Sequence, residues 1–502
     1  MSRRVAAMLL GLAAAGCASL EMPLRARLAS EAPRVRECAE WYRTLDERVV
    51  AAGVRDAQDA AVPGFPYLRV NRLLAALRPA AAASAPALQA LGERMRLLDL
   101  EARRFELGNL PFSPAEDAAD PRHGLGARAA LRRTQECGRL LSEIDFAKPE
   151  VRAALLERAA VPDDYSLLAR VVGLYPLTRL AFAAGVRRYE EETRAAFRRE
   201  LAVPPGAILL RYGPPPPERP LPRLRAAAIL ASSSDNPLGI PEPSEADLRD
   251  LLAAHAPSLE IEVRADYDRF GALRWLIDGE APGVDGSELA VYAHPAWTRY
   301  RGRVLLQLVY TLWFPERPPQ VEGDILAGKL DGITWRVTLA PDGEPLIYDA
   351  IHPCGCFHMF FPTPRAQPLP APEGLEEWNF SPQSLPRVAE GERPLVRIAS
   401  GTHAIERVGL ARGGDSVVRY RLRPYAELRS LQRLDGARRS AFGPEGLVPG
   451  SERPERVLFW PMGIPSAGQM RQWGRHPTAF VGRRHFDDAD LFERRFVLDL
   501  AP

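Results

Sequence analysis

The chain has 502 residues, of which 46% are hydrophobic and 26% are charged, and this is the composition of a globular protein with two or three domains. Its net charge of +2 gives no indication of the large, clustered basic surface that nucleic-acid binding requires, so we expect no nucleic-acid partner. After the N-terminal residues, no stretch is long and apolar enough to suggest a membrane-spanning helix.

The N-terminus has the organisation of a signal peptide. Arg3 and Arg4 precede an apolar run over residues 5–15, which is shorter than the roughly 20 residues that cross a bilayer. Cys17 follows three small residues at 14–16, and this segment resembles the lipobox of bacterial prelipoproteins. The resemblance implies that Cys17 is acylated and becomes the mature N-terminus.

Acylation at Cys17 would anchor the protein in a membrane of the cell envelope. By analogy with lipoprotein sorting, Ala18 carries no aspartate-type retention signal, so we expect the outer membrane, with the chain facing the periplasm. The alternative is an ordinary secretory signal with an accidental cysteine. The membrane is the partner that this segment predicts, and the sequence names no protein partner.

The N-terminal part of the chain has the hydrophobic periodicity of helices. Apolar residues recur every three or four positions, as at Leu88, Leu91 and Met95. We therefore predict a signal peptide over residues 1–17 and a helical domain over residues 18–202. Breaks between its helices are expected at segments that contain proline: 63–66, 110–124 and 161–164.

Proline is about twice as frequent as usual, with 48 residues, and it is dense over residues 203–222. Such a stretch is typical of an extended spacer, so we place a linker there. From residue 223 onward the hydrophobic pattern changes to period two, which predicts strands. The fold class that follows is α+β, with a helical domain before a mainly β domain over 223–502 that forms a sandwich or a bent sheet.

One β-hairpin has a recognisable turn. Ile333, Trp335 and Val337 alternate with polar residues, Pro341-Asp342-Gly343 is a turn sequence, and a returning strand begins at Leu346. Further strands are expected at 304–314, 395–399, 417–422, 457–460, 478–484 and 495–500.

Cys38 and Cys137 lie in helix-like stretches of the N-terminal domain. An oxidising periplasm permits disulfides, and a bridge between these two would close a loop of 99 residues, worth up to about 4.7 kcal/mol in the chain-entropy model. We predict this disulfide, with two buried thiols as the alternative.

The C-terminal domain contains a dense group of potential metal ligands. A regular strand would separate its outer histidines by about 20 Å, but Pro353 and Gly355 favour a curled loop in which the group comes together. Thiolates and imidazoles suit zinc or copper. His403 and His294 are expected to contribute from a distance. The group itself occupies alternate positions: His352, Cys354, Cys356 and His358.

Three other interpretations of this group remain open. Cys354 and Cys356 could form a strained disulfide across Gly355, pack as buried small side chains, or act as a thiol nucleophile with a histidine base. The first functional hypothesis is a binding or structural envelope lipoprotein with a metal- or redox-active Cys-Gly-Cys turn. The second is a periplasmic thiol- or metal-dependent hydrolase.

Overall fold

The computed structural model describes residues 22–111, 126–276, 279–412 and 418–501. Cys17 and the lipobox lie outside these residues. Within the described segments, every helix is too short or too polar to cross a membrane.

The predicted α+β class is confirmed, because a helical region up to residue 198 is followed by a mostly β region. Helices hold 34% of the residues and strands hold 25%. The chain divides into two compact units, and we describe each by itself. The first unit comprises residues 1–162 and 437–444, and the second comprises residues 163–436 and 445–502.

The first unit is mainly helical. Residues 63–66 were expected only to break two helices, but they belong to a β-hairpin of β1 (Ala60–Val62) and β2 (Phe65–Val70). Gly64 has a φ of 83°, a conformation that glycine adopts without strain and that allows the tight turn. The helices are α2 (Met22–Leu28), α3 (Pro33–Ala51), α4 (Arg72–Ala82), α5 (Ala85–Asn109), α7 (Ala127–Phe146) and α8 (Pro149–Arg158).

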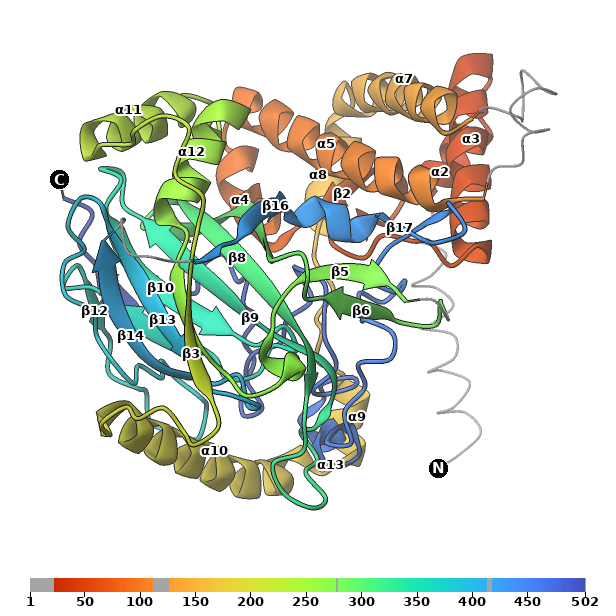
Figure 1. The fold of residues 1–502 in the computed structure, drawn as a ribbon. Helices are drawn as coiled ribbons and strands as arrows, with labels where there is room; N and C mark the ends of the chain where they lie inside the picture. The colour runs from red at the N-terminus through yellow and green to blue at the C-terminus, as the bar shows by residue number, and fades with distance from the viewer. Residues whose placement is uncertain (1–21, 112–125, 277–278, 413–417, 502) are drawn as a thin grey trace. The chain divides into compact units, whose positions relative to one another are not determined.

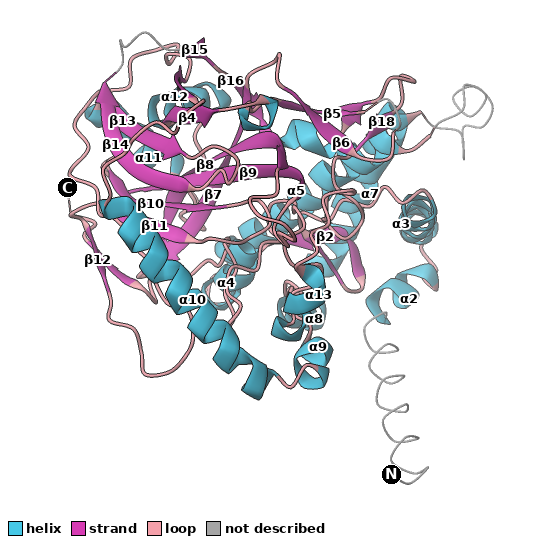
Figure 2. Ribbon diagram, turned by 60° about the horizontal axis from the view of Figure 1, so that its bottom comes forward, coloured by secondary structure: helices cyan, strands magenta, loops and turns pink. Residues whose placement is uncertain are grey.

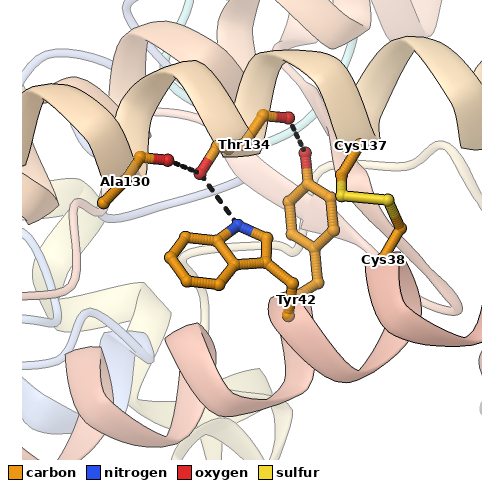
Figure 3. The surroundings of a disulfide bond; sticks show 6 residues. Cys38, Tyr42, Ala130, Thr134 and Cys137 are labelled. Carbon is orange, nitrogen blue, oxygen red and sulfur yellow. Dashed lines mark hydrogen bonds between the residues drawn. A yellow bond between two sulfur atoms is a disulfide. The ribbon is translucent and has the colours of Figure 1, made fainter. Parts of the chain in front are cut away.

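A disulfide between Cys38 and Cys137 joins α3 to α7 (Figure 3). Beside it, the hydroxyl of Tyr42 donates a hydrogen bond to the carbonyl of Thr134 at 3.0 Å. Trp41 donates its indole N–H to Thr134 Oγ1 at 3.1 Å. The covalent bond and these two hydrogen bonds hold the same faces of α3 and α7 together.

The second unit is a β-sandwich (Figure 1). One sheet has the strand order β11-β10-β9-β8-β7-β16, and the other has the order β14-β13-β4-β3-β15. Leu308 and Val337 of the first sheet and Ile261 and Val396 of the second are buried in one hydrophobic core. In Figure 1, helices α11 and α12 lie at the top of the sandwich and α10 runs along its bottom.

The bounds of these elements follow in chain order. The helices are α9 (Leu167–Val172), α10 (Tyr175–Arg198), α11 (Arg223–Ser233), α12 (Glu245–His255) and α13 (Arg456–Phe459). The strands of the six-stranded sheet are β7 (Ala290–Tyr300), β8 (Arg303–Arg317), β9 (Gly328–Leu339), β10 (Pro345–Ile351), β11 (Met359–Pro362) and β16 (Arg421–Pro424). Those of the other sheet are β3 (Ile208–Gly213), β4 (Ser258–Val263), β13 (Glu392–Ile398), β14 (Ile405–Arg412) and β15 (Val418–Arg419). The remaining strands are β5 (Ala272–Trp275), β6 (Pro282–Asp285), β12 (Ala366–Pro368), β17 (Leu431–Gln432), β18 (Arg438–Arg439) and β19 (Phe496–Leu498).

The predicted hairpin of β9 and β10 is confirmed, with Val337 paired to Tyr348. Two strand predictions are wrong. Residues 457–460 lie in helix α13 and the turn after it, and residues 478–484 form a loop closed by the hydrogen bond from Thr478 N to the carbonyl of Arg484. Short apolar runs have the same pattern in a buried strand as in a helical turn, so hydrophobicity alone does not separate the two.

The boundary between the compact units lies at residue 162, so α9 and α10 belong to the second unit. Phe197 of α10 packs in the core of the sandwich, 6.1 Å from Phe361 between ring centroids. The stretch 203–222, expected as a linker, contains β3, which pairs with β4. Helical periodicity identifies an apolar face, but it does not identify the core against which that face packs.

We expect the double substitution Cys38→Ala/Cys137→Ala to lower the free energy of unfolding of the first unit by about 2–5 kcal/mol. The unfolded chain regains the entropy of a 99-residue loop. Urea unfolding followed by circular dichroism measures the change. Cys354→Ala/Cys356→Ala is the matched control, since both of these cysteines are free, and it should leave the first unit unchanged. Equal first-unit stability in the two variants would contradict a stabilising crosslink.

Candidate functional site

The connection between β10 and β11 forms a tight turn around the two cysteines. Gly355 N donates to the carbonyl of His352 at 2.8 Å, and His352 N donates to the carbonyl of Cys356 at 3.0 Å. Gly355 has a φ of 93°, and a Cβ at this position would lie 2.3 Å from the carbonyl oxygen of Pro477. The loop is curled as predicted, and only glycine fits at its centre.

Cys354 and Cys356 are brought together but are not bonded. Cys354 is buried, and its sulfur accepts a hydrogen bond from Cys356 N at 3.3 Å. Interaction with the Cys354 thiol, together with burial, raises the pKa of Cys356 well above its ordinary value. Cys356 is therefore a neutral thiol near pH 7, and a neutral thiol is a weak nucleophile.

Two of the predicted histidines share one buried carboxylate. Asp331 accepts from His352 Nδ1 at 3.0 Å and from His403 Nδ1 at 2.9 Å. His403 Nε2 lies 3.5 Å from Asp268 Oδ1, and its ring stacks on Phe314 at 3.9 Å between centroids. The geometry is an imidazole held between two carboxylates.

The charges of this cluster follow from its geometry. Burial alone raises the pKa of Asp331, but His352 and His403 hold it well below its usual range. Burial alone lowers the pKa of His403, but the carboxylates of Asp268 and Asp331 raise it above its ordinary value. The two carboxylates therefore favour the protonated, cationic form of His403, and their charges compensate the cost of its desolvation.

The other two histidines lie elsewhere. His358 Nε2 is 3.0 Å from Asp349 Oδ2, and burial lowers the pKa of His358 to about 3. His294 packs against the rings of Tyr425 and Trp473, at 4.7 and 4.6 Å between centroids. Burial also lowers the pKa of His294 to about 3.

The six residues predicted as metal ligands thus occupy four separate environments. The structure brings Cys354 to Cys356 and His352 to His403, but it does not bring all six together. Across the residues that the structure describes, no group of three or more His, Cys, Asp or Glu side chains is placed to hold a metal ion. The reason is that the carboxylates and aromatic rings that engage the histidines come from other parts of the chain.

The Cys-Gly-Cys turn forms one wall of a cavity of about 490 Å³ in the second unit. This volume is typical of small-molecule pockets, which hold roughly 300–1,000 Å³. Ring contacts line it, with Phe182 5.2 Å from Phe459 and Tyr189 5.2 Å from Phe357 between centroids. The apolar lining side chains include Phe182, Val186, Tyr189, Phe357, Trp378, Phe380, Phe459, Ile464 and Phe480.

The polar groups of the cavity wall are largely occupied or uncharged. Glu377 Oε1 accepts hydrogen bonds from two backbone N–H groups of the neighbouring loop, at 2.6 and 3.0 Å. Arg484 donates to Thr478 Oγ1 at 2.8 Å and to the carbonyl of Trp378 at 2.6 Å. Burial raises the pKa of Glu377, and it raises the pKa of Glu455 to about 7. The wall therefore presents mainly apolar surface to a ligand.

Sequence reasoning missed the carboxylates that organise this region. Asp268, Asp331, Glu377 and Glu455 carry no motif, and isolated acidic residues in a sequence are usually on the surface. The spacing of Phe182, Val186 and Tyr189 indicates a helix face but not a pocket wall. Comparison with known protein families, curated proteins and solved structures finds no match for this chain.

We expect Gly355→Ala to destabilise the second unit by about 1–3 kcal/mol more than Gly391→Ala. Both glycines have positive φ values, 93° and 81°, but the added Cβ meets Pro477 only at position 355 and meets nothing within 4 Å at position 391. Urea unfolding of both variants isolates the steric cost. Equal losses would show that the turn does not depend on this close approach.

We expect His403→Gln to cost most stability at low pH. Because the folded pKa of His403 lies above the unfolded value of about 6.5, its contribution is complete below about pH 6.5 and is lost as the pH rises through the folded pKa. The difference in unfolding free energy between the unmodified chain and the variant should therefore shrink from pH 6 to pH 9, as measured by urea titrations.

The control for this experiment is His294→Gln. The pKa of His294 is lowered, so its contribution is present above the unfolded pKa and falls with decreasing pH. The two variants should show opposite slopes against pH. A flat difference for His403→Gln would contradict the buried imidazolium.

Proposed function

We propose that this protein is an envelope lipoprotein, anchored through Cys17, that binds a hydrophobic and uncharged small molecule in the pocket of its second unit. The observation that carries this proposal is the cavity of about 490 Å³ with a mainly aromatic and aliphatic wall. Burying apolar ligand surface there is favourable by about 25 cal/mol per Å². Such a ligand needs no charged partner from the wall.

The state of the polar groups supports an uncharged ligand. Arg484 is engaged by Thr478 and Trp378, so an anionic head would have to displace existing hydrogen bonds. The raised pKa values of Glu377 and Glu455 reduce the negative charge that would attract a cation. A ligand hydroxyl can donate to Glu455 in either protonation state, and a ligand carbonyl can accept from it when it is protonated, which its pKa of about 7 allows near neutral pH.

The geometry favours binding over thiol catalysis. Catalytic thiols need a nearby base or another source of a lowered pKa. His352 and His358 flank the turn, but their rings are engaged by Asp331 and Asp349. In the described chain, no histidine forms a hydrogen bond with either thiol of the turn. The raised pKa of Cys356 also disfavours thiol catalysis, because it keeps the thiol protonated.

Gly185→Trp tests whether the cavity is the binding site. Gly185 lies on α10 at the cavity wall, and a Cβ there meets open space. The indole should fill the cavity mouth without disturbing the helix, since larger residues are better helix formers than glycine. We expect the affinity for the uncharged fluorophore N-phenyl-1-naphthylamine, measured by its fluorescence increase, to fall at least about ten-fold, or about 1.4 kcal/mol.

Ala184→Trp is the matched control, because Ala184 is the preceding helix residue, is exposed, and does not line the cavity. It should bind the fluorophore like the unmodified chain. Equal affinities of the two tryptophan variants would place the fluorophore elsewhere and overturn the proposed site.

A further inference from the structure

Large apolar side chains are exposed on one part of the second unit. They lie on α9, on the turn after it and on the first turns of α10, and each is between 60% and 74% exposed. Single exposed apolar residues are common on proteins, but a contiguous group marks an interaction surface. We call this group the apolar patch: Leu167, Leu168, Val171, Val172, Leu174 and Leu177.

A second segment extends the patch. Gly173, between α9 and α10, lies against Pro461, since a Cβ on Gly173 would be 2.6 Å from the Pro461 Cβ. Figure 2 shows α13 beside α9, near the start of α10. The exposed side chains that this segment adds are Val457, Leu458 and Trp460.

The way α9 is held explains why its leucines point outward. Arg170 is buried beneath the helix and donates to the carbonyls of Met462 at 2.8 Å and Gly482 at 2.7 Å. The polar side chain of α9 thus faces the protein while Leu168 and Val171 face solvent. This is the reverse of the usual arrangement for a surface helix, in which the polar face is outside.

The stretch of chain that carries α9 and the first half of α10 has charges of one sign, whereas the α13 segment is preceded by Glu452 and Glu455. The sequence contains no acidic residue between Asp164 and Glu190. Segments that lie in the interface of a bilayer are typically rich in leucine, tryptophan and arginine. Anionic headgroups attract their basic side chains. Arg170 is buried beneath α9, so the arginines of this interval that can meet a headgroup are Arg179, Arg187 and Arg188, the last of which also pairs with Glu192 at 2.8 Å.

We infer that the apolar patch is a membrane-docking face that inserts into the surface of a bilayer containing anionic lipid. The apolar patch belongs to the folded second unit, so it would dock independently of the proposed acyl anchor at Cys17. Phe182 and Gly185 of the pocket wall follow the patch directly along α10. A docked protein would therefore open its pocket beside lipid acyl chains; this consequence rests on the proposed function, whereas the docking itself does not.

The test compares vesicle binding of full-length chains that carry Cys17→Ala, so that no acyl anchor contributes. Vesicles contain phosphatidylcholine and phosphatidylglycerol at about three to one, and co-sedimentation gives the partition coefficient. The triple substitution Leu168→Ser, Val171→Ser and Leu177→Ser should lower this coefficient at least about ten-fold, because insertion of their side chains drives binding. The N-terminal residues are the same in every variant, so a difference between the coefficients of two variants reports the substituted side chains.

The matched control replaces the same residue types at exposed positions away from the patch. It is Leu224→Ser, Val418→Ser and Leu434→Ser, whose side chains are 86%, 50% and 74% exposed, and it should bind within about two-fold of its parent. Thermal unfolding checks that both triple variants fold.

Three results would overturn the inference. The first is equal partition coefficients for the two triple variants, and the second is unchanged binding of the parent chain when phosphatidylglycerol is omitted. The third is a dimer that the patch substitutions dissociate without changing vesicle binding, which would assign the face to a second copy of the chain. The affinity for the fluorophore, measured without vesicles, tests the pocket separately. It should stay unchanged in the patch variant even if one of these three results is obtained.

Discussion

The second unit depends on one buried carboxylate, that of Asp331. It lies on β9 of the six-stranded sheet, receives His352 from the Cys-Gly-Cys turn, and receives His403 from the turn between β13 and β14 of the other sheet. A single anion thus ties the two layers of the sandwich to the turn that bounds the pocket. The hydrogen bonds from His352 and His403 offset the cost of burying the Asp331 carboxylate. Asp268, on the far side of His403, favours the charged form of that histidine.

The pocket follows from what surrounds that turn. Gly355 lets the turn press against Pro477, and the Cys356 thiol beside it remains neutral because contact with Cys354 and burial disfavour its thiolate. Glu377 and Arg484 satisfy the backbone of the loops that close the cavity. The polar groups of the wall stabilise its shape, and the aromatic surface is left to meet a ligand.

Helix α10 carries three different environments along its length. Its first turns expose Leu177, its middle lines the cavity with Phe182 and Tyr189, and its end buries Phe197 in the sandwich core. An apolar series at helical spacing predicts the helix in all three parts. It does not distinguish an exposed face from a pocket wall or a core, because that depends on which other elements lie opposite.

The sequence by itself determined the α+β class and the β9–β10 hairpin, because local periodicity and turn chemistry decide these. It also predicted that Pro353 and Gly355 would favour a curled loop over a regular strand. Only the tertiary structure decided that the neighbouring histidines would face carboxylates instead of a shared metal. Asp331 and Asp349 reach them across strands, and such pairings depend on sheet register and burial, which leave no local pattern in the chain.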